Sequence, residues 1–173
     1  RAGRALPPLF LTANAALITG WWLAHGGAAQ LGSLSGDLSA LGQITALLGA
    51  LSVLVLLTLI SRVPWLERRY GQDHLNHWHR WAGITATTLL TIHVIASTLA
   101  FAFTANTGLA RQITDFVLYY PNVLAAIAGF ALFVLVAATS ARALRRRLRY
   151  ETWWLLHLYA YLAVALTFAH QIT

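Results

Sequence analysis

Residues 79–93 read HRWAGITATTLLTIH, an apolar stretch that begins and ends with histidine. In an α-helix the step from His79 to His93 is a rotation of about 1400°, so the second ring returns to within about 40° of the first. The same step rises about 21 Å, which is a large part of a bilayer's hydrocarbon core. A helix here would present one histidine toward each leaflet from a single face.

The rest of the chain is equally apolar. Of its 173 residues, 58% are hydrophobic and 10% are charged, whereas a soluble domain carries about 25% charged residues. A bilayer removes the need for a charged surface, so the composition favours a membrane protein over a soluble helical bundle. The chain has no cysteine, which excludes disulfides, thiolate-held zinc and cysteine-held iron–sulfur clusters.

Five stretches are long enough to cross a bilayer, which takes about 20 apolar residues per helix. They cover about residues 7–25, 41–60, 81–103, 116–139 and 152–169. We therefore predict an all-α membrane protein, one domain over residues 1–173, built as a bundle of five transmembrane helices. The segments between them are expected to be loops, with 26–40 a plain connector. The chain starts at Arg1 and has no methionine, so we expect a fragment or a processed product.

The arginines predict the orientation. This topology puts eleven on one side of the membrane and Arg111 alone on the other. The eleven are Arg1, Arg4, Arg62, Arg68, Arg69, Arg80, Arg142, Arg145, Arg146, Arg147 and Arg149. Because arginine collects on the cytoplasmic side, the N-terminus is expected inside. The basic residues sit between apolar runs and form no polar face, so we expect no nucleic acid partner.

A second pair of histidines occupies the last predicted helix. His157 and His170 are thirteen residues apart, a rise of about 20 Å that matches the first pair. Thirteen residues end about 140° from a whole number of turns, so this pair does not share one ideal helix face. Two helices that run in the same direction would still offer rings at the same two depths.

Paired histidines at two depths are typical of haem ligation. A six-coordinate haem iron takes one imidazole from each side of the ring, and helices of a bundle can supply both. Arg80 adjoins His79 and could pair with haem propionates, and Gly83 leaves room for the macrocycle. His74 and His77 are expected to be solvated cytoplasmic loop residues, and His25 to be interfacial.

Further motifs connect these histidines to a known family. SRVPWLER at 61–68 leads to HRWAG at 79–83, and YETWW at 150–154 leads to His157 and then to His170. With this spacing, the chain resembles the ferric reductase-like transmembrane domain of NADPH oxidases, ferric reductases and many bacterial oxidoreductases. The resemblance implies that the four histidines are the metal ligands of two stacked b-type haems. His79 and His157 would hold the inner haem, and His93 and His170 the outer one.

The resemblance also implies a function. An oxidoreductase module of this kind moves electrons across the bacterial inner membrane to an external electron acceptor, ferric iron or oxygen. The donor would be a cytosolic flavin/nicotinamide dehydrogenase domain or subunit, because family members usually continue through a sixth helix into domains that bind FAD and NAD(P)H. This chain ends at Thr173 without that helix, and it contains no GxGxxG fingerprint, so we expect no activity with NAD(P)H alone.

Two other functions remain open. The chain could be a haem b membrane anchor that takes electrons from quinol and serves a separate periplasmic reductase. It could also be a non-haem metal transporter, a protein of another class. Transport of a metal would favour acidic residues inside the spans, and none of the five acids lies in one.

Overall fold

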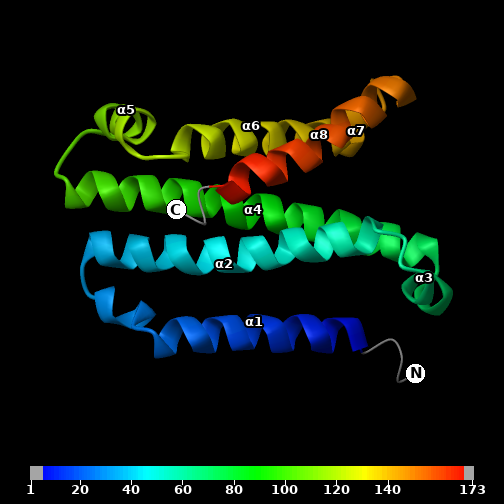
Figure 1. The fold of residues 1–173 in the computed structure, drawn as a ribbon, viewed down its shortest axis with the longest axis horizontal. Coiled ribbons are helices and arrows are strands. Elements are labelled where there is room, and N and C mark those ends of the chain that lie inside the picture. The colour runs from blue at the N-terminus through cyan, green and yellow to red at the C-terminus, as the bar shows by residue number, and fades with distance from the viewer. Residues whose placement is uncertain (1–5, 170–173) are drawn as a thin grey trace. The chain divides into compact units, whose positions relative to one another are not determined.

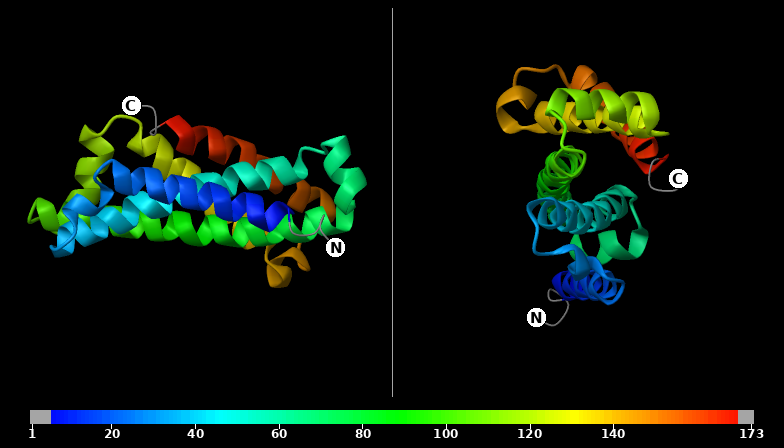
Figure 2. Two further views of the ribbon diagram at one scale, coloured as in Figure 1. Left: turned by 90° about the horizontal axis from the view of Figure 1, so that it is seen from below. Right: turned by 90° about the vertical axis from the view of Figure 1, so that its left-hand side faces the viewer.

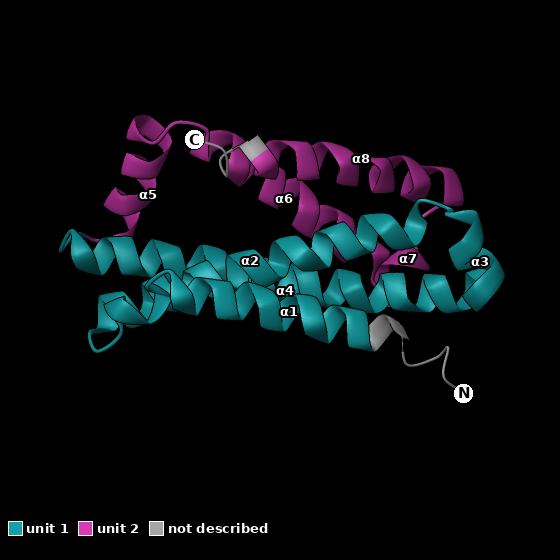
Figure 3. Cartoon of the chain, turned by 60° about the horizontal axis from the view of Figure 1, so that its bottom comes forward, with its two compact units in different colours: residues 1–107 teal, residues 108–173 magenta. Residues whose placement is uncertain are grey.

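A computed structural model describes residues 6–169, with the side chains of residues 9–141 and 143–168. This part of the chain is built of helices and contains no strand. The chain divides into two compact units, and the boundary between them in the sequence lies between Thr107 and Gly108 (Figure 3). Among the described residues, three helices are long and apolar enough to cross a membrane: Leu34–Ile60, Gln72–Thr104 and Val123–Ser140. The prediction of an all-α membrane protein is confirmed at this level.

The first unit is an antiparallel pair of long helices with a third beside it. Its elements are α1 (Leu6–Ala24), η2 (Gly27–Gln30), α2 (Leu34–Ile60), α3 (Pro64–Tyr70) and α4 (Gln72–Thr104). Figures 1 and 2 show α2 and α4 running side by side in opposite directions, with α1 alongside α2. The α2–α4 pair has by far the most extensive contact in the unit and forms its core.

Residues seven apart make the seam between α2 and α4. Three contacts define it: Gly42 with Ser97, Gly49 with Leu90, and Leu56 with Gly83. Successive contacts are seven residues further along α2 and seven residues earlier along α4, so the two helices keep one register over the whole seam. Small residues let membrane helices approach closely, and a Cβ atom at Gly42 would lie 2.5 Å from the Ser97 hydroxyl.

Both long helices begin earlier than predicted. The expected loop 26–40 contains η2 and the first turns of α2. Ser33 caps α2, because its hydroxyl accepts a hydrogen bond from the Gly36 N–H at 3.1 Å. Hydropathy marks where a helix enters lipid and does not register a helix that continues into water, so the polar first turns escaped prediction.

The start of α4 was also predicted too late, and by more residues. Gly71, with φ of 77°, ends α3 and starts α4, a backbone conformation that favours glycine. The helix then runs from Gln72, nine residues before the predicted start at Trp81. His74 and His77 therefore lie on the first turns of α4, and their assignment to a loop is wrong.

The second unit pairs two antiparallel helices. Its elements are α5 (Leu109–Tyr119), α6 (Val123–Ser140), α7 (Arg142–Arg145) and α8 (Tyr150–Ala169). Figure 1 shows α6 and α8 running in opposite directions. They meet at Gly129, where a Cβ atom would lie 2.8 Å from the carbonyl oxygen of Ala163. A glycine thus sets the closest approach in this unit as well.

A proline divides the fourth predicted helix. We expected one helix over residues 116–139, but α5 ends at Tyr119 and α6 begins at Val123. Pro121 has no N–H to donate and disfavours helical backbone at the residue before it. Tyr120 is accordingly extended, and Asn122 takes a left-handed conformation with φ of 61°. The single-helix prediction was wrong because Pro121 was read as part of a span.

Candidate functional site

The backbone of α2 holds both histidines of α4. Nδ1 of His79 lies 3.1 Å from the carbonyl oxygen of Leu56, and Nδ1 of His93 lies 2.9 Å from that of Gly42. The two rings are fourteen residues apart, and so are the two carbonyls. The same ring-to-carbonyl arrangement therefore occurs twice along one antiparallel register.

These hydrogen bonds determine which ring nitrogen can bind a metal. A carbonyl oxygen only accepts, so each ring carries its proton on Nδ1 and its lone pair on Nε2. An acceptor at the far nitrogen also fixes the orientation of the ring. Both rings are half-buried. His79 and His93 are therefore oriented, and Nε2 is the ring nitrogen that could bind a metal.

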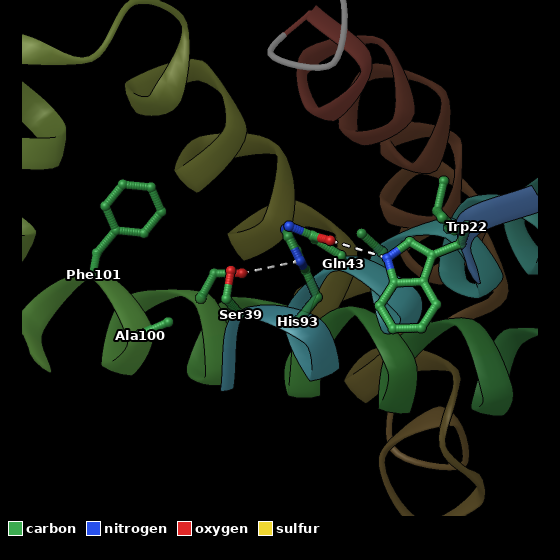
Figure 4. A pocket seen from close by; sticks show the side chains of 9 residues that line it. Trp22, Ser39, Gln43, His93, Ala100 and Phe101 are labelled. Carbon is green, nitrogen blue, oxygen red and sulfur yellow. Dashed lines mark hydrogen bonds between the residues drawn. The ribbon is translucent and has the colours of Figure 1, made fainter. Parts of the chain in front are cut away.

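A pocket of about 470 Å³ opens beside His93, between α1, α2 and α4 (Figure 4). Its lining residues are Trp22, Ser39, Gln43, Ala46, Leu47, His93, Ser97, Ala100 and Phe101. The Ser97 hydroxyl oxygen lies 3.3 Å from His93 Nδ1. Because that nitrogen already donates to Gly42, the serine oxygen is a second acceptor for the same proton. No side chain of the lining other than His93 can carry charge.

Hydrogen bonds fix the wall of this pocket that lies across from α4. Oε1 of Gln43 accepts from Nε1 of Trp22 at 3.0 Å and from Nε2 of Gln30 at 2.8 Å. Both bonds go to the oxygen, so the amide's NH₂ group is left as its donor. Gly27 packs under the Trp22 indole, where a side chain would collide with the ring. Sequence analysis missed Trp22 and Gln43, because their link depends on how α1 meets α2.

His157 is held within the second unit. Its Nδ1 lies 3.2 Å from the Ser140 hydroxyl at the end of α6. Its ring stacks on Trp153, one turn earlier on α8, with ring centroids 5.1 Å apart. All three candidate ligands that lie in the described residues thus have Nδ1 bonded to a neighbouring helix. His170 lies outside the described residues.

Trp153 carries an unsatisfied donor. Its Nε1 is buried and has no hydrogen-bond partner among the described residues, a state that costs free energy unless a ligand supplies an acceptor. The Arg145 guanidinium lies 4.4 Å from the centroid of the Trp153 ring, within the range of a cation–π contact. A buried N–H donor and a nearby cation beside His157 could together bind a carboxylate.

A family model for the ferric reductase-like transmembrane component matches residues 45–168 of the chain. The chain belongs to this family. No curated protein and no solved structure matches it. The resemblance inferred from the motifs is confirmed, and membership indicates an oxidoreductase module for electron transfer across a membrane.

The part that matches the ferric reductase-like family contains three of the four predicted ligands. His79, His93 and His157 fall inside residues 45–168, and His170 falls two residues beyond. Arg80 is exposed on α4 directly after His79. Gly83 faces α2, where its nearest neighbour is Leu56.

The remaining histidines of this ferric reductase-like chain have other neighbours. His77 accepts a hydrogen bond from Trp81 Nε1 at 3.1 Å, and Nδ1 of His25 bonds the Trp21 carbonyl at 2.8 Å. Among the described residues no three His, Asp or Glu side chains gather where they could hold a metal ion by themselves. Haem ligation needs no such cluster, because the macrocycle fills four positions around iron and the protein supplies two.

Proposed function

We propose that this protein carries electrons across the membrane through two b-type haems. The donor is a cytoplasmic flavin/NAD(P)H dehydrogenase domain or subunit, and the acceptor lies on the outer side and is ferric iron or oxygen. One observation carries the proposal: His79 and His93 are each held at Nδ1 by α2, fourteen residues apart and in one register. Two equivalent, pre-oriented imidazoles are what two haems at two depths require.

The four histidines would form two ligand pairs. His79 with His157 holds the inner haem, and His93 with His170 holds the outer one. Bound haem supplies iron that cycles between ferric and ferrous states at a potential set by its ligands and surroundings. The chain's own part is to hold His79, His93 and His157 at Nδ1, so that Nε2 of each ring could bind the iron. Fixed imidazoles limit the rearrangement that accompanies electron transfer.

Residues near the inner pair fit the haem carboxylates. The Trp153 N–H is a buried donor in need of an acceptor, and Arg80 follows His79 on an exposed position of α4. A charge-assisted hydrogen bond from either group to a propionate would be stronger than a neutral one. Gly83 lies one turn after His79 and faces Leu56 on α2.

The bundle is proposed to have five spans, α1, α2, α4, α6 and α8, enclosing the two stacked haems in the bacterial inner membrane. The N-terminus is inside, because that orientation puts eleven of the twelve arginines in the cytoplasm. In this orientation the pocket beside His93 belongs to the outer half. Its lining contains no Asp, Glu, Lys or Arg, which suits a small neutral acceptor such as oxygen better than a charged ferric chelate.

Haem content is the direct test. Purified protein should yield two b-type haems per chain in a pyridine haemochrome assay, both six-coordinate and low-spin in the optical spectrum. Well-folded protein without haem would contradict the proposal and favour the metal-transporter alternative. If quinol reduces the haems and the flavin domain does not, the result would favour the alternative in which the chain is a quinol-fed membrane anchor.

A further inference from the structure

The segment between the second-unit boundary and α6 is an amphipathic helix. We expected residues 105–115 to be a loop, but α5 (Leu109–Tyr119) occupies most of it. At 100° per residue, Leu109, Ile113, Phe116 and Val117 fall within about 100° of one another. One face of α5 is therefore apolar over its whole length.

The opposite face is polar and nearly neutral. Arg111, Thr114 and Asp115 fall within another arc of about 100°, which also includes Leu118. Arg111 Nε and Asp115 Oδ2 lie 4.0 Å apart, one helical turn from each other. The two charges offset each other, so α5 carries no net charge with which to select charged lipids.

Three of the four large side chains on the apolar face are exposed in this structure, and the fourth, Phe116, is half-buried. Leu109 is 49% exposed, Ile113 is 50% exposed and Val117 is 38% exposed. Three large aliphatic side chains in a row on a short helix are costly in water, because each buried methylene is worth about 0.8 kcal/mol. Something apolar is needed to cover this face.

Short connections keep α5 at the membrane surface. α4 ends where Asn106 takes a left-handed φ of 50° and the Thr107 N–H donates to the Ala102 carbonyl at 3.0 Å, a typical helix stop. Four residues, 105–108, then lead to α5 and can span at most about 14 Å. Three residues, 120–122, lead on to α6. Since α4 and α6 are both candidate spans, these short connections keep α5 near the membrane surface at which α4 ends and α6 begins.

We propose that α5 is an interfacial helix that lies in the plane of the bilayer, with Leu109, Ile113 and Val117 inserted among the lipid chains. The proposal rests on α4 and α6 crossing the membrane. An amphipathic helix of this kind places its apolar face about 5–10 Å into the boundary between headgroups and acyl chains. The Arg111–Asp115 face points to water. Apolar burial holds the helix, and the headgroup charge plays no part.

Spin labelling tests this directly, because the chain has no native cysteine to remove. Full-length protein carrying Ile113→Cys or Thr114→Cys is labelled with a nitroxide and placed in phosphatidylcholine vesicles, with and without phosphatidylglycerol. The two adjacent labels differ by about 100° around the helix. The accessibility of each label to oxygen, which partitions into lipid, and to a water-soluble nickel chelate gives its depth. Leu109→Cys and Arg111→Cys form a second pair if either first variant fails to fold.

The label at Ile113 should be several-fold more accessible to oxygen than to the nickel chelate, and the label at Thr114 should show the reverse, in both vesicle compositions. Nickel accessibility at both positions would place α5 in water and overturn the proposal. An immobile Ile113 label that neither reagent reaches would show protein covering the face and would also overturn it. So would a depth that depends on phosphatidylglycerol. The measurement needs no haem, so its outcome is separate from that of the haem assay.

Discussion

His79, His93 and His157 share a hydrogen bond at Nδ1, but the bonds come from different sources. Main-chain carbonyls of α2 hold the first two rings, and a serine hydroxyl holds the third. Each bond is made within one unit and involves one ring. Loss of one ring therefore leaves the support of the others in place, and the two proposed haems should be separable by mutation.

Replacing one ligand should remove one haem. His93→Ala should abolish the outer haem and spare most of the inner one, and His79→Ala should do the reverse, because about 21 Å of helix separates the rings. The pyridine haemochrome assay should find about one haem per chain in each variant, down from the two proposed. His74→Ala and His77→Ala, on the same helix, should retain both haems. Loss of both haems from a folded single-ligand variant would refute two independent sites.

The Trp153 N–H offers a finer test. Trp153→Phe keeps an aromatic ring against His157 but removes the buried donor. If that donor serves a haem propionate, its loss leaves the carboxylate charge less compensated, and the reduction potential of the inner haem should fall by tens of millivolts. A redox titration followed optically measures this shift.

Trp154→Phe is the matched control, because Trp154 is half exposed and lies one residue away. It should leave both potentials unchanged. Equal shifts in the two variants would mean that the Trp153 donor has no specific role.

Sequence predicted the candidate ligands but not what supports them. The spacing of His79 and His93 is visible in the chain because it is a property of one helix. The roles of the Leu56 and Gly42 carbonyls cannot be recognised in the sequence, because every residue has a carbonyl. Only the register between α2 and α4 brings these two to the histidines. Trp22 and Gln43 were missed for the same reason. Residues that act through another helix need tertiary structure to be found.

At the scale of elements, glycine governs how closely helices pack. Gly42 and Gly49 let α2 and α4 approach closely, and Gly129 does the same for α6 and α8. At Gly129 the nearest atom is a backbone oxygen, which cannot move without moving α8. This contact should therefore be the less tolerant of an added methyl group.

Gly129→Ala should destabilise the second unit. The added Cβ would lie 2.8 Å from the Ala163 carbonyl oxygen, and overpacking of this kind costs about 1–3 kcal/mol. Thermal unfolding in detergent micelles should show a lower Tm. Gly20→Ala on α1 is the control, because no atom lies within 4 Å of its added Cβ. It should be neutral or stabilise by up to about 1 kcal/mol through helix propensity. Equal Tm changes in the two variants would contradict the packing argument.

The helices show which structural features can be predicted from the sequence. Most residues of the five predicted apolar stretches are helical, because hydropathy over some 20 residues is a strong signal, but the fourth stretch is divided between α5 and α6. Ends and breaks were less predictable. Gly71 starts α4 inside a polar segment, and α5 was hidden because its apolar residues are only half of a short helix. Pro121 was visible in the sequence, and its effect on the preceding residue could have been used.

At the scale of the whole molecule, the distribution of arginine suggests where the electron donor docks. The segments 62–80 and 142–149 carry nine of the twelve arginines and are proposed to face the cytoplasm. NADPH alone should not reduce the haems of this chain, and reduction should appear when a cytosolic flavoprotein domain is added. Stopped-flow absorbance measures the rate. Rapid reduction by NADPH without added flavin would contradict this assignment.

Charge reversal should weaken that docking. Arg146 and Arg147 are exposed, so Arg146→Glu with Arg147→Glu should slow reduction by the flavoprotein and make it less sensitive to salt, because exposed charges are screened over about 8–10 Å. The rate is compared at several ionic strengths. Arg111→Glu, proposed to face the other side, is the control and should leave the rate and its salt dependence unchanged. An equal effect of both variants would argue against a cytoplasmic docking face.

The carbonyls behind His79 and His93 have an evolutionary consequence. A carbonyl is present whatever side chain its residue carries, so no codon change at Leu56 or Gly42 can delete the acceptor, although a bulkier residue at Gly42 could displace it. Ser140 beside His157 is different, because substitution by alanine removes its hydroxyl. The hydrogen bonds to His79 and His93 therefore survive most substitutions at their acceptor residues. The hydrogen bond to His157 can be lost by one substitution, so it is exposed to drift and to selection. If His157 holds the proposed inner haem, inherited changes in its potential would therefore begin at the serine.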